Sequence, residues 1–142
     1  MTNPNCPFPL PQSLSSDLGK VHSYWQGLIR GQASEMPYWD DVKLADLPAL
    51  EDRLMLVTAF AQPERFRFEI VGKEITARYG HEIASRFADD IDINPPLDFF
   101  RAQASATIEC RAPTYCKAGK YERLLLPLWG EGHIGVLLGI VA

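Results

Sequence analysis

Three histidines and three cysteines are the side chains of this chain that could bind a metal, attack a substrate or change redox state. The histidines lie far apart in the sequence, without the close spacing of a metal site: His22, His81 and His133. The cysteines include no C-x-x-C pair, so we expect neither a disulfide framework nor a zinc knuckle but reduced thiols: Cys6, Cys110 and Cys116. A redox pair of Cys110 and Cys116 is the alternative, because the adjacent Arg111 and Lys117 would favour a thiolate.

A run of acidic residues could in principle hold a hard cation. Asp89, Asp90 and Asp92 lie close together, but the run lacks the glycine and the terminal glutamate of a calcium loop. We therefore interpret it as a solvated acidic turn. Since no set of nucleophile, base and metal ligand is recognisable, the sequence predicts a protein that is not an enzyme.

The composition is that of one globular domain. With 142 residues, of which 46% are hydrophobic and 23% charged, the chain can bury a core without disulfides or a structural metal. A net charge of -4 gives no electrostatic basis for binding nucleic acid. The first residues lack the basic and apolar segments of a signal peptide, and no stretch has the length of a membrane span. We expect a cytoplasmic protein with neither a nucleic-acid nor a membrane partner.

The chain is expected to divide into a flexible tail, residues 1–16, and a single domain, residues 17–142. Four prolines disfavour helix and strand in the tail, so we expect it to be dispensable for folding. The apolar residues that follow recur at intervals of three and four, which predicts an amphipathic helix over residues 17–29. Its stripe could cover either the sheet of its own chain or that of a second copy. We expect it to form the interface of a homodimer, in which Trp25→Glu would give a monomer: Leu18, Val21, Trp25 and Ile29.

Period-two and helical patterns follow one another in the rest of the chain. A hairpin is predicted from strands at 54–60 and 65–71, with Phe66, Phe68 and Ile70 on one face of the second strand. A short helix is expected at 73–79 and a longer one at 97–107, with Pro95 and Pro96 at its start. Glycine-bearing turns then separate three strands of an antiparallel meander, at 114–117, 121–129 and 134–141.

This order of elements resembles that of a PAS domain, in particular of the short, stand-alone bacterial PAS-like proteins. The resemblance extends over roughly residues 21–141. One difference is that Ala84-Ser85 stands where a glycine is expected after the short helix. The motifs that carry the resemblance are Trp25, Pro37-Tyr38-Trp39, the Phe-Arg-Phe strand ending at Gly72, Ile75 with Tyr79-Gly80, and the closing strand Arg123 to Leu128.

The resemblance implies an α+β fold, with a five-stranded antiparallel sheet, helices over one face of it and an N-terminal amphipathic helix. It also implies a small ligand cavity between the sheet and the long helix. The alternative role of the same side chains is core packing, which is the more common role of an apolar stripe. The residues expected to line the cavity are Phe68, Ile70, Ile83, Phe87, Phe99, Gln103, Leu125, Val136 and Leu138, with Leu97 and Phe100 beside them.

The function implied is that of a sensory or adaptor module in signal transduction, which binds a small apolar or amphipathic ligand, a signalling protein, or both. No cofactor is expected, because residues 97–107 offer no axial ligand for haem and residues 83–92 lack the cysteine of a flavin photosensor. Two alternatives remain, a structural protein-interaction module with a filled core and a small enzyme on a cone-shaped α+β fold. The sequence identifies neither the ligand nor the signal nor the downstream partner.

Overall fold

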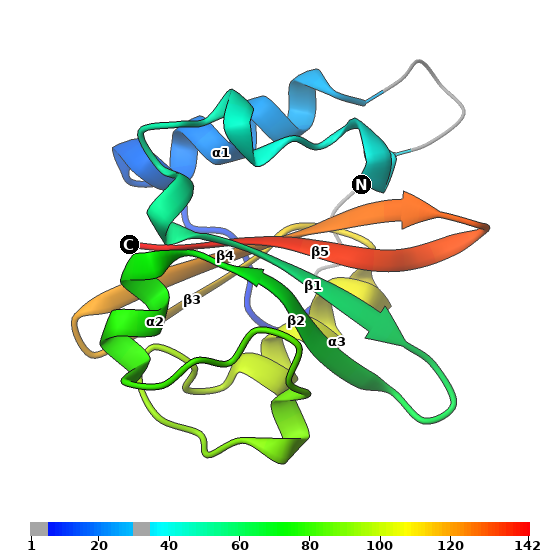
Figure 1. Cartoon of the computed structure of the whole chain (residues 1–142). Helices are drawn as coiled ribbons and strands as arrows, with labels where there is room; N and C mark the ends of the chain where they lie inside the picture. The colour runs from blue at the N-terminus through cyan, green and yellow to red at the C-terminus, as the bar shows by residue number, and fades with distance from the viewer. Residues whose placement is uncertain (1–5, 30–34) are drawn as a thin grey trace.

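The structure is a computed structural model that describes residues 6–29 and 35–142. Figure 1 shows a central sheet with helices above and below it. Short 3-10 turns connect the helix α1 to the first strand. The helices are α1 (Ser16–Gly27), α2 (Lys73–Tyr79) and α3 (Phe100–Cys110), and the strands are β1 (Leu54–Phe60), β2 (Arg65–Val71), β3 (Thr114–Ala118), β4 (Tyr121–Gly130) and β5 (His133–Val141).

The five strands form one antiparallel sheet in the order β2-β1-β5-β4-β3. This confirms three expectations: the α+β class, the five-stranded antiparallel sheet and the bounds of the first hairpin. The last strand of the chain, β5, lies in the centre between β1 and β4. The edge of β2 is covered by residues 85–87, where the Phe68 N–H donates to the Arg86 carbonyl at 2.9 Å.

Helices lie on both faces of the sheet, not on one face as expected. In Figure 1, α1 and the turns after it lie above the sheet, whereas α2 and α3 lie below it. Six consecutive residues of β4, Arg123 to Leu128, are buried, as expected for a strand covered on both faces. The apolar stripe of α1 packs against the face of the sheet opposite to α2 and α3.

This packing corrects the expected dimer interface. Leu18 and Val21 are fully buried within the chain, Trp25 is 5% exposed and Ile29 is partly buried against the same core. The Trp25 Nε1–H also donates to the Pro127 carbonyl at 2.9 Å. These side chains cover their own sheet, so they are not available to a second copy.

A β-bulge changes the face on which Ile70 lies. Phe68 pairs with Val57 and Ile70 with Leu56, so Glu69 is an extra residue in β2. Its carboxylate accepts a hydrogen bond from the Thr58 hydroxyl at 2.9 Å and pairs with Arg67. Because one extra residue reverses the alternation, Ile70 turns away from the face of Phe68 and is 48% exposed.

The long helix begins three residues later than predicted. Phe99 precedes it with φ +61°, in the left-handed region, and its side chain is 63% exposed. Leu97 and Phe100 are buried instead. The carbonyls of Pro96 and Asp98 accept hydrogen bonds from a buried arginine, described below, which holds the chain before Phe100 outside the helix.

The described part of the N-terminal segment packs on the domain, in contrast to the flexible tail expected. Cys6 forms a disulfide with Cys110, so these two cysteines are not the reduced thiols expected, and Cys110 is not paired with Cys116. The Phe8 carbonyl accepts a hydrogen bond from the Tyr115 N–H at 3.0 Å, and two leucines of the segment pack against the core, Leu10 and Leu14. Prolines exclude helix and strand here, but they allow an extended segment that buries its apolar residues.

Candidate functional site

The space between the sheet and α3, where a ligand cavity was expected, is filled by side chains. The Phe100 ring lies against Phe68, with ring centroids 5.1 Å apart, and edge-on against Phe66 at 6.3 Å. Met55 and Leu125 fill the room over Gly139, where an added Cβ would lie 2.9 Å from a Met55 side-chain atom. The centre of this layer is thus an apolar core.

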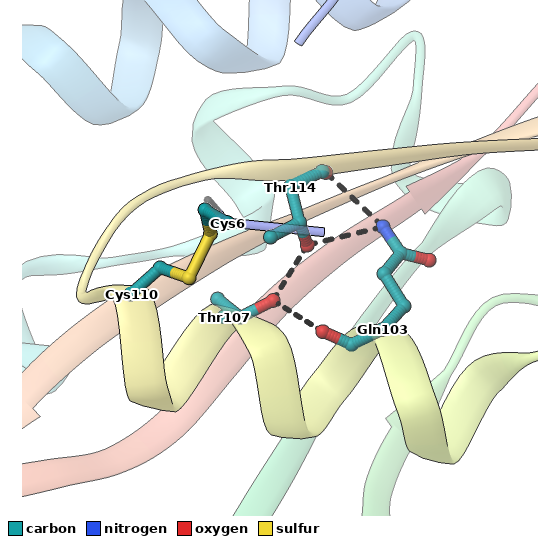
Figure 2. The surroundings of a disulfide bond; sticks show 5 residues. All are labelled: Cys6, Gln103, Thr107, Cys110 and Thr114. Carbon is teal, nitrogen blue, oxygen red and sulfur yellow. Dashed lines mark hydrogen bonds between the residues drawn. A yellow bond between two sulfur atoms is a disulfide. The ribbon is translucent and has the colours of Figure 1, made fainter. Parts of the chain in front are cut away.

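Beside this core lies a buried hydrogen-bonded network (Figure 2), which includes Gln103. The Gln103 amide donates to the carbonyl of Thr114 at 3.1 Å and to its hydroxyl at 3.2 Å. The Thr107 hydroxyl donates to the Gln103 carbonyl at 2.9 Å and lies 2.6 Å from the Thr114 hydroxyl. Gln103 therefore joins α3 to β3 and does not line a cavity, because its amide is bonded to protein groups.

Arg123 is the charged member of the network and is fully buried. Its Nε–H donates to the Gln103 amide oxygen at 2.8 Å, and its two terminal nitrogens donate to the carbonyls of Pro96 and Asp98, each at 2.7 Å. Burial lowers the pKa of the Arg123 guanidinium, while nearby Cys116, Tyr121 and Asp98 act in the opposite direction. The arrangement fixes the loop before α3 to the sheet. The sequence signal for this network is an arginine at an inward position of an apolar strand. In the sequence, that strand stands out only as a motif of the family resemblance.

Strand register separates the other residues that were expected to share one cavity. Leu125 pairs with Gly139, whereas Leu138 pairs with Leu126, so Leu125 and Leu138 point to opposite faces of the sheet. Val136 pairs with Leu128 and lies on the face of Leu138. These two residues are thus wrongly assigned to the α3 side.

The other four residues of the expected cavity pack tightly or are exposed. Ile83 is buried. Phe87 is partly buried. The Arg65 guanidinium lies 3.8 Å from the centroid of the Phe87 ring, and the centroids of the Phe87 and Phe60 rings are 5.7 Å apart. Phe99 and Ile70 are exposed, as described above. Of the nine residues, the structure brings Phe68, Leu125 and Gln103 together on the α3 side.

A groove on the opposite face contains the most exposed tryptophan described, Trp39, at 51%. We call it the Trp39 groove. It measures about 370 Å³ and is lined by Trp39, Thr58, Ala59, Phe60, Gly130, Glu131, His133, Gly135 and Val136.

The Trp39 ring lies on the backbone of β4. The Trp129 N–H donates to the Pro37 carbonyl at 2.8 Å, and Tyr38 forms a parallel bridge with Trp129. A Cβ at Gly130 would lie 2.3 Å from the ring, so the glycine permits this close approach. The ring is therefore positioned by its backbone while much of its surface faces solvent. In the sequence, Trp39 is recognisable as part of a motif of the family resemblance, but its exposure to solvent is not predicted.

A second groove, of about 520 Å³, lies where the N-terminal segment meets α1 and the start of β3. Its apolar wall includes Leu10 and Trp25, and its polar groups include His22 and Arg111. The His22 ring stacks on Trp25 with centroids 6.0 Å apart. Burial lowers the pKa of the His22 imidazole, which favours its neutral form. We call this the disulfide groove, because Cys6 contributes to its lining.

Tyr115 is expected to titrate far above an ordinary tyrosine. Burial, together with a 2.6 Å hydrogen bond to the Glu122 carboxylate, raises its pKa to about 12. Because the folded-state pKa lies above the unfolded value, its contribution to stability is complete below pH 10 and is lost as pH rises towards 12. Ultraviolet difference titration of the wild type and of Tyr115→Phe checks this. The variant should lack one late phenolate transition, and an ordinary pKa for the missing transition would contradict the prediction.

Neither a cluster of metal-ligating side chains nor a helix that could span a membrane is found within residues 6–29 and 35–142. No group of three or more His, Cys, Asp or Glu in this part of the chain could hold a metal ion. Among its helices, none is both long and apolar enough to cross a membrane. Comparisons with protein-family models, with curated proteins and with solved structures found no match to this chain.

Proposed function

We propose that this chain is a PAS-like adaptor domain of signal transduction, which docks a protein partner in the Trp39 groove. The order of elements expected for a PAS domain, a hairpin, short helical segments, one longer helix and a meander, is the order along the chain. The filled layer between the sheet and α3 favours an adaptor over a sensor with an internal ligand. In this role the domain performs no chemistry on its partner.

The observation that carries the proposal is the exposed Trp39 ring, which lies against the backbone of Gly130 and lines one groove with Phe60. Buried tryptophans at the centre of an interface contribute much of its binding energy. A ring already fixed in place loses little conformational freedom when a partner binds. The partner expected is a protein that inserts an apolar anchor side chain between the two rings, with polar contacts to Glu131 and His133 at the rim.

Site-specific photo-crosslinking in cells tests this surface while the partner is still unidentified. A photoreactive residue at exposed Glu131, on the groove rim, should crosslink a discrete protein. The crosslink should be lost in the Trp39→Ala background. It should weaken in Gly130→Ala, because the new methyl group displaces the ring.

The matched control carries the photoreactive residue at Lys120, in the turn at the other end of β4, and should not give the same product. Equal crosslinking from both positions would contradict the proposal, as would a product that survives Trp39→Ala. Thermal unfolding of each variant must show a folded protein. We expect Trp39→Ala to change the unfolding free energy by no more than about 1 kcal/mol, since the ring is half-exposed.

Small-molecule sensing is a second candidate function, favoured by the disulfide groove. Its volume falls in the usual range for ligand pockets, and an arginine in its lining, Arg111, suits an amphipathic molecule with an anionic group. A thermal-shift screen of fatty acids and aromatic carboxylates should then give hits that Arg111→Gln abolishes and Lys117→Gln retains. A screen without stabilising compounds would remove this candidate and leave the adaptor proposal unaffected.

A further inference from the structure

The N-terminal segment, residues 6–15, is fastened at both ends. At one end it continues into α1, and at the other Cys6 is bonded to Cys110, the last residue of α3. Between these points the structure gives one backbone hydrogen bond to the sheet, from the Tyr115 N–H to the Phe8 carbonyl, and the packing of Leu10 and Leu14. A segment with so few contacts depends strongly on its covalent fastening.

This segment covers an edge of the sheet. The strand β3 is the outermost strand on its side and pairs with β4 alone among the strands. The N–H of Tyr115 is directed outward to Phe8. An uncovered edge strand offers unpaired backbone groups, which natural proteins usually shield. The disulfide fastens the segment that covers this edge.

The disulfide is also open to attack. Cys6 and Cys110 are both partly exposed, whereas Cys116 is buried. In Figure 2 the bond lies at the end of α3, beyond the network of Gln103, Thr107 and Thr114, and these residues make their hydrogen bonds to one another without either sulfur atom. Breaking the bond removes no member of the network, so α3 can stay in place while the segment leaves.

We propose that the Cys6–Cys110 disulfide is a redox-controlled clasp, which a dithiol reductant opens to release residues 6–15 from the edge of β3. A thiolate of the reductant attacks one sulfur of the bond and forms a mixed disulfide, and the other cysteine leaves as a thiolate. The second thiol of the reductant then displaces the first cysteine. Both cysteine thiolates take protons, so two electrons and two protons are transferred, and the reductant ends as a disulfide.

The proposal is independent of the partner at the Trp39 groove. It agrees with the cytoplasmic location expected from the sequence, because disulfides in that compartment are usually transient and serve redox sensing. In an oxidising compartment the same bond would remain a permanent fastening. The two roles predict different reduced proteins. With a redox-controlled bond the reduced protein stays folded and its segment is free, whereas with a permanent fastening it does not.

Hydrogen exchange on the full chain distinguishes these roles. The wild type is compared in its oxidised form and after reduction by a small dithiol protein in a glutathione buffer. After reduction, the Tyr115 amide, whose N–H donates to the Phe8 carbonyl, should exchange about ten-fold faster or more, as in a locally open segment. Amides of β5, in the centre of the sheet, should stay protected on the same time scale.

Proteolysis gives a second readout. Phe8 and Leu10 are each followed by proline, so chymotrypsin should cut the released segment after Leu14. Cutting should be fast in the reduced wild type and in Cys6→Ser, and slow in the oxidised wild type. The control Cys116→Ser keeps the clasp and should behave as the oxidised wild type does until it is reduced.

Three results would overturn the proposal. The first is a bond that the dithiol reductant fails to open while the protein is folded. The second is a reduced wild type whose segment remains as protected as in the oxidised form. The third is global unfolding on reduction, with β5 amides exposed together with the segment, which would make the bond a structural requirement. If Cys6→Ser does not fold, reduction of the folded wild type still decides among these results.

Discussion

Replacing Arg123 with methionine is expected to lower the free energy of unfolding by about 3–5 kcal/mol. The side chain donates to Gln103, to the Pro96 carbonyl and to the Asp98 carbonyl, and all three acceptors would lose a buried donor. Each unsatisfied buried group costs about 1–3 kcal/mol, while relief from burying the charge recovers part of the loss. Urea denaturation followed by circular dichroism measures the change.

Two further variants establish the cause. Arg86→Met removes an exposed arginine, and its effect should stay within about 0.5 kcal/mol. Combining Arg123→Met with Gln103→Leu should cost less than the sum of the single changes, because the two side chains share a hydrogen bond. Additive losses would show that the bond between Arg123 and Gln103 contributes little, and an Arg123→Met protein as stable as the wild type would show that the network does not hold the loop before α3.

Truncating Trp25 to alanine should be similarly damaging, at about 3–5 kcal/mol. The ring fills the layer between α1 and the sheet, and its N–H satisfies the Pro127 carbonyl. Trp39→Ala is the matched control, since this second tryptophan is half-exposed and should cost no more than about 1 kcal/mol. Thermal unfolding and analytical ultracentrifugation are measured on both variants.

The two measurements also decide what α1 is for. If the helix covers its own sheet, Trp25→Ala lowers stability whatever the state of association. A fully stable Trp25→Ala protein that changes from dimer to monomer would instead restore the interface expected from the sequence. Whether the wild type forms a homodimer through another surface is a separate question, which the same sedimentation run answers.

Local pattern was sufficient to predict most of the elements of this fold. The alternation at 65–71 and the glycine-bearing turns of the meander set strand bounds that the structure largely reproduces. The start of α3 was missed, because its first turn is displaced by contacts with Arg123, which is distant in sequence. Whether α1 covers its own sheet could not be decided from the sequence, because an amphipathic helix has the same pattern against its own sheet as against another chain.

The candidate site was less predictable, since it depends on register and on pairings across the chain. The face of Ile70 follows from the bulge at Glu69, which the sequence of β2 does not mark. The separation of Leu125 from Leu138 follows from the pairing across the β4–β5 turn. The bond between Cys6 and Cys110 joins residues 104 positions apart, and spacing alone cannot indicate such a pair.

The central position of β5 has a consequence for how this protein is made. Its neighbour β1 is complete at residue 60, yet it must wait for residues 133–141 before its inner edge is paired. Long-range pairing of this kind slows folding, and a chain still on the ribosome exposes the unpaired strand during the wait. We therefore expect nascent chains halted before β5 to need chaperones, whereas chains released with β5 should fold without them. Force measurements on stalled chains of increasing length would locate the step.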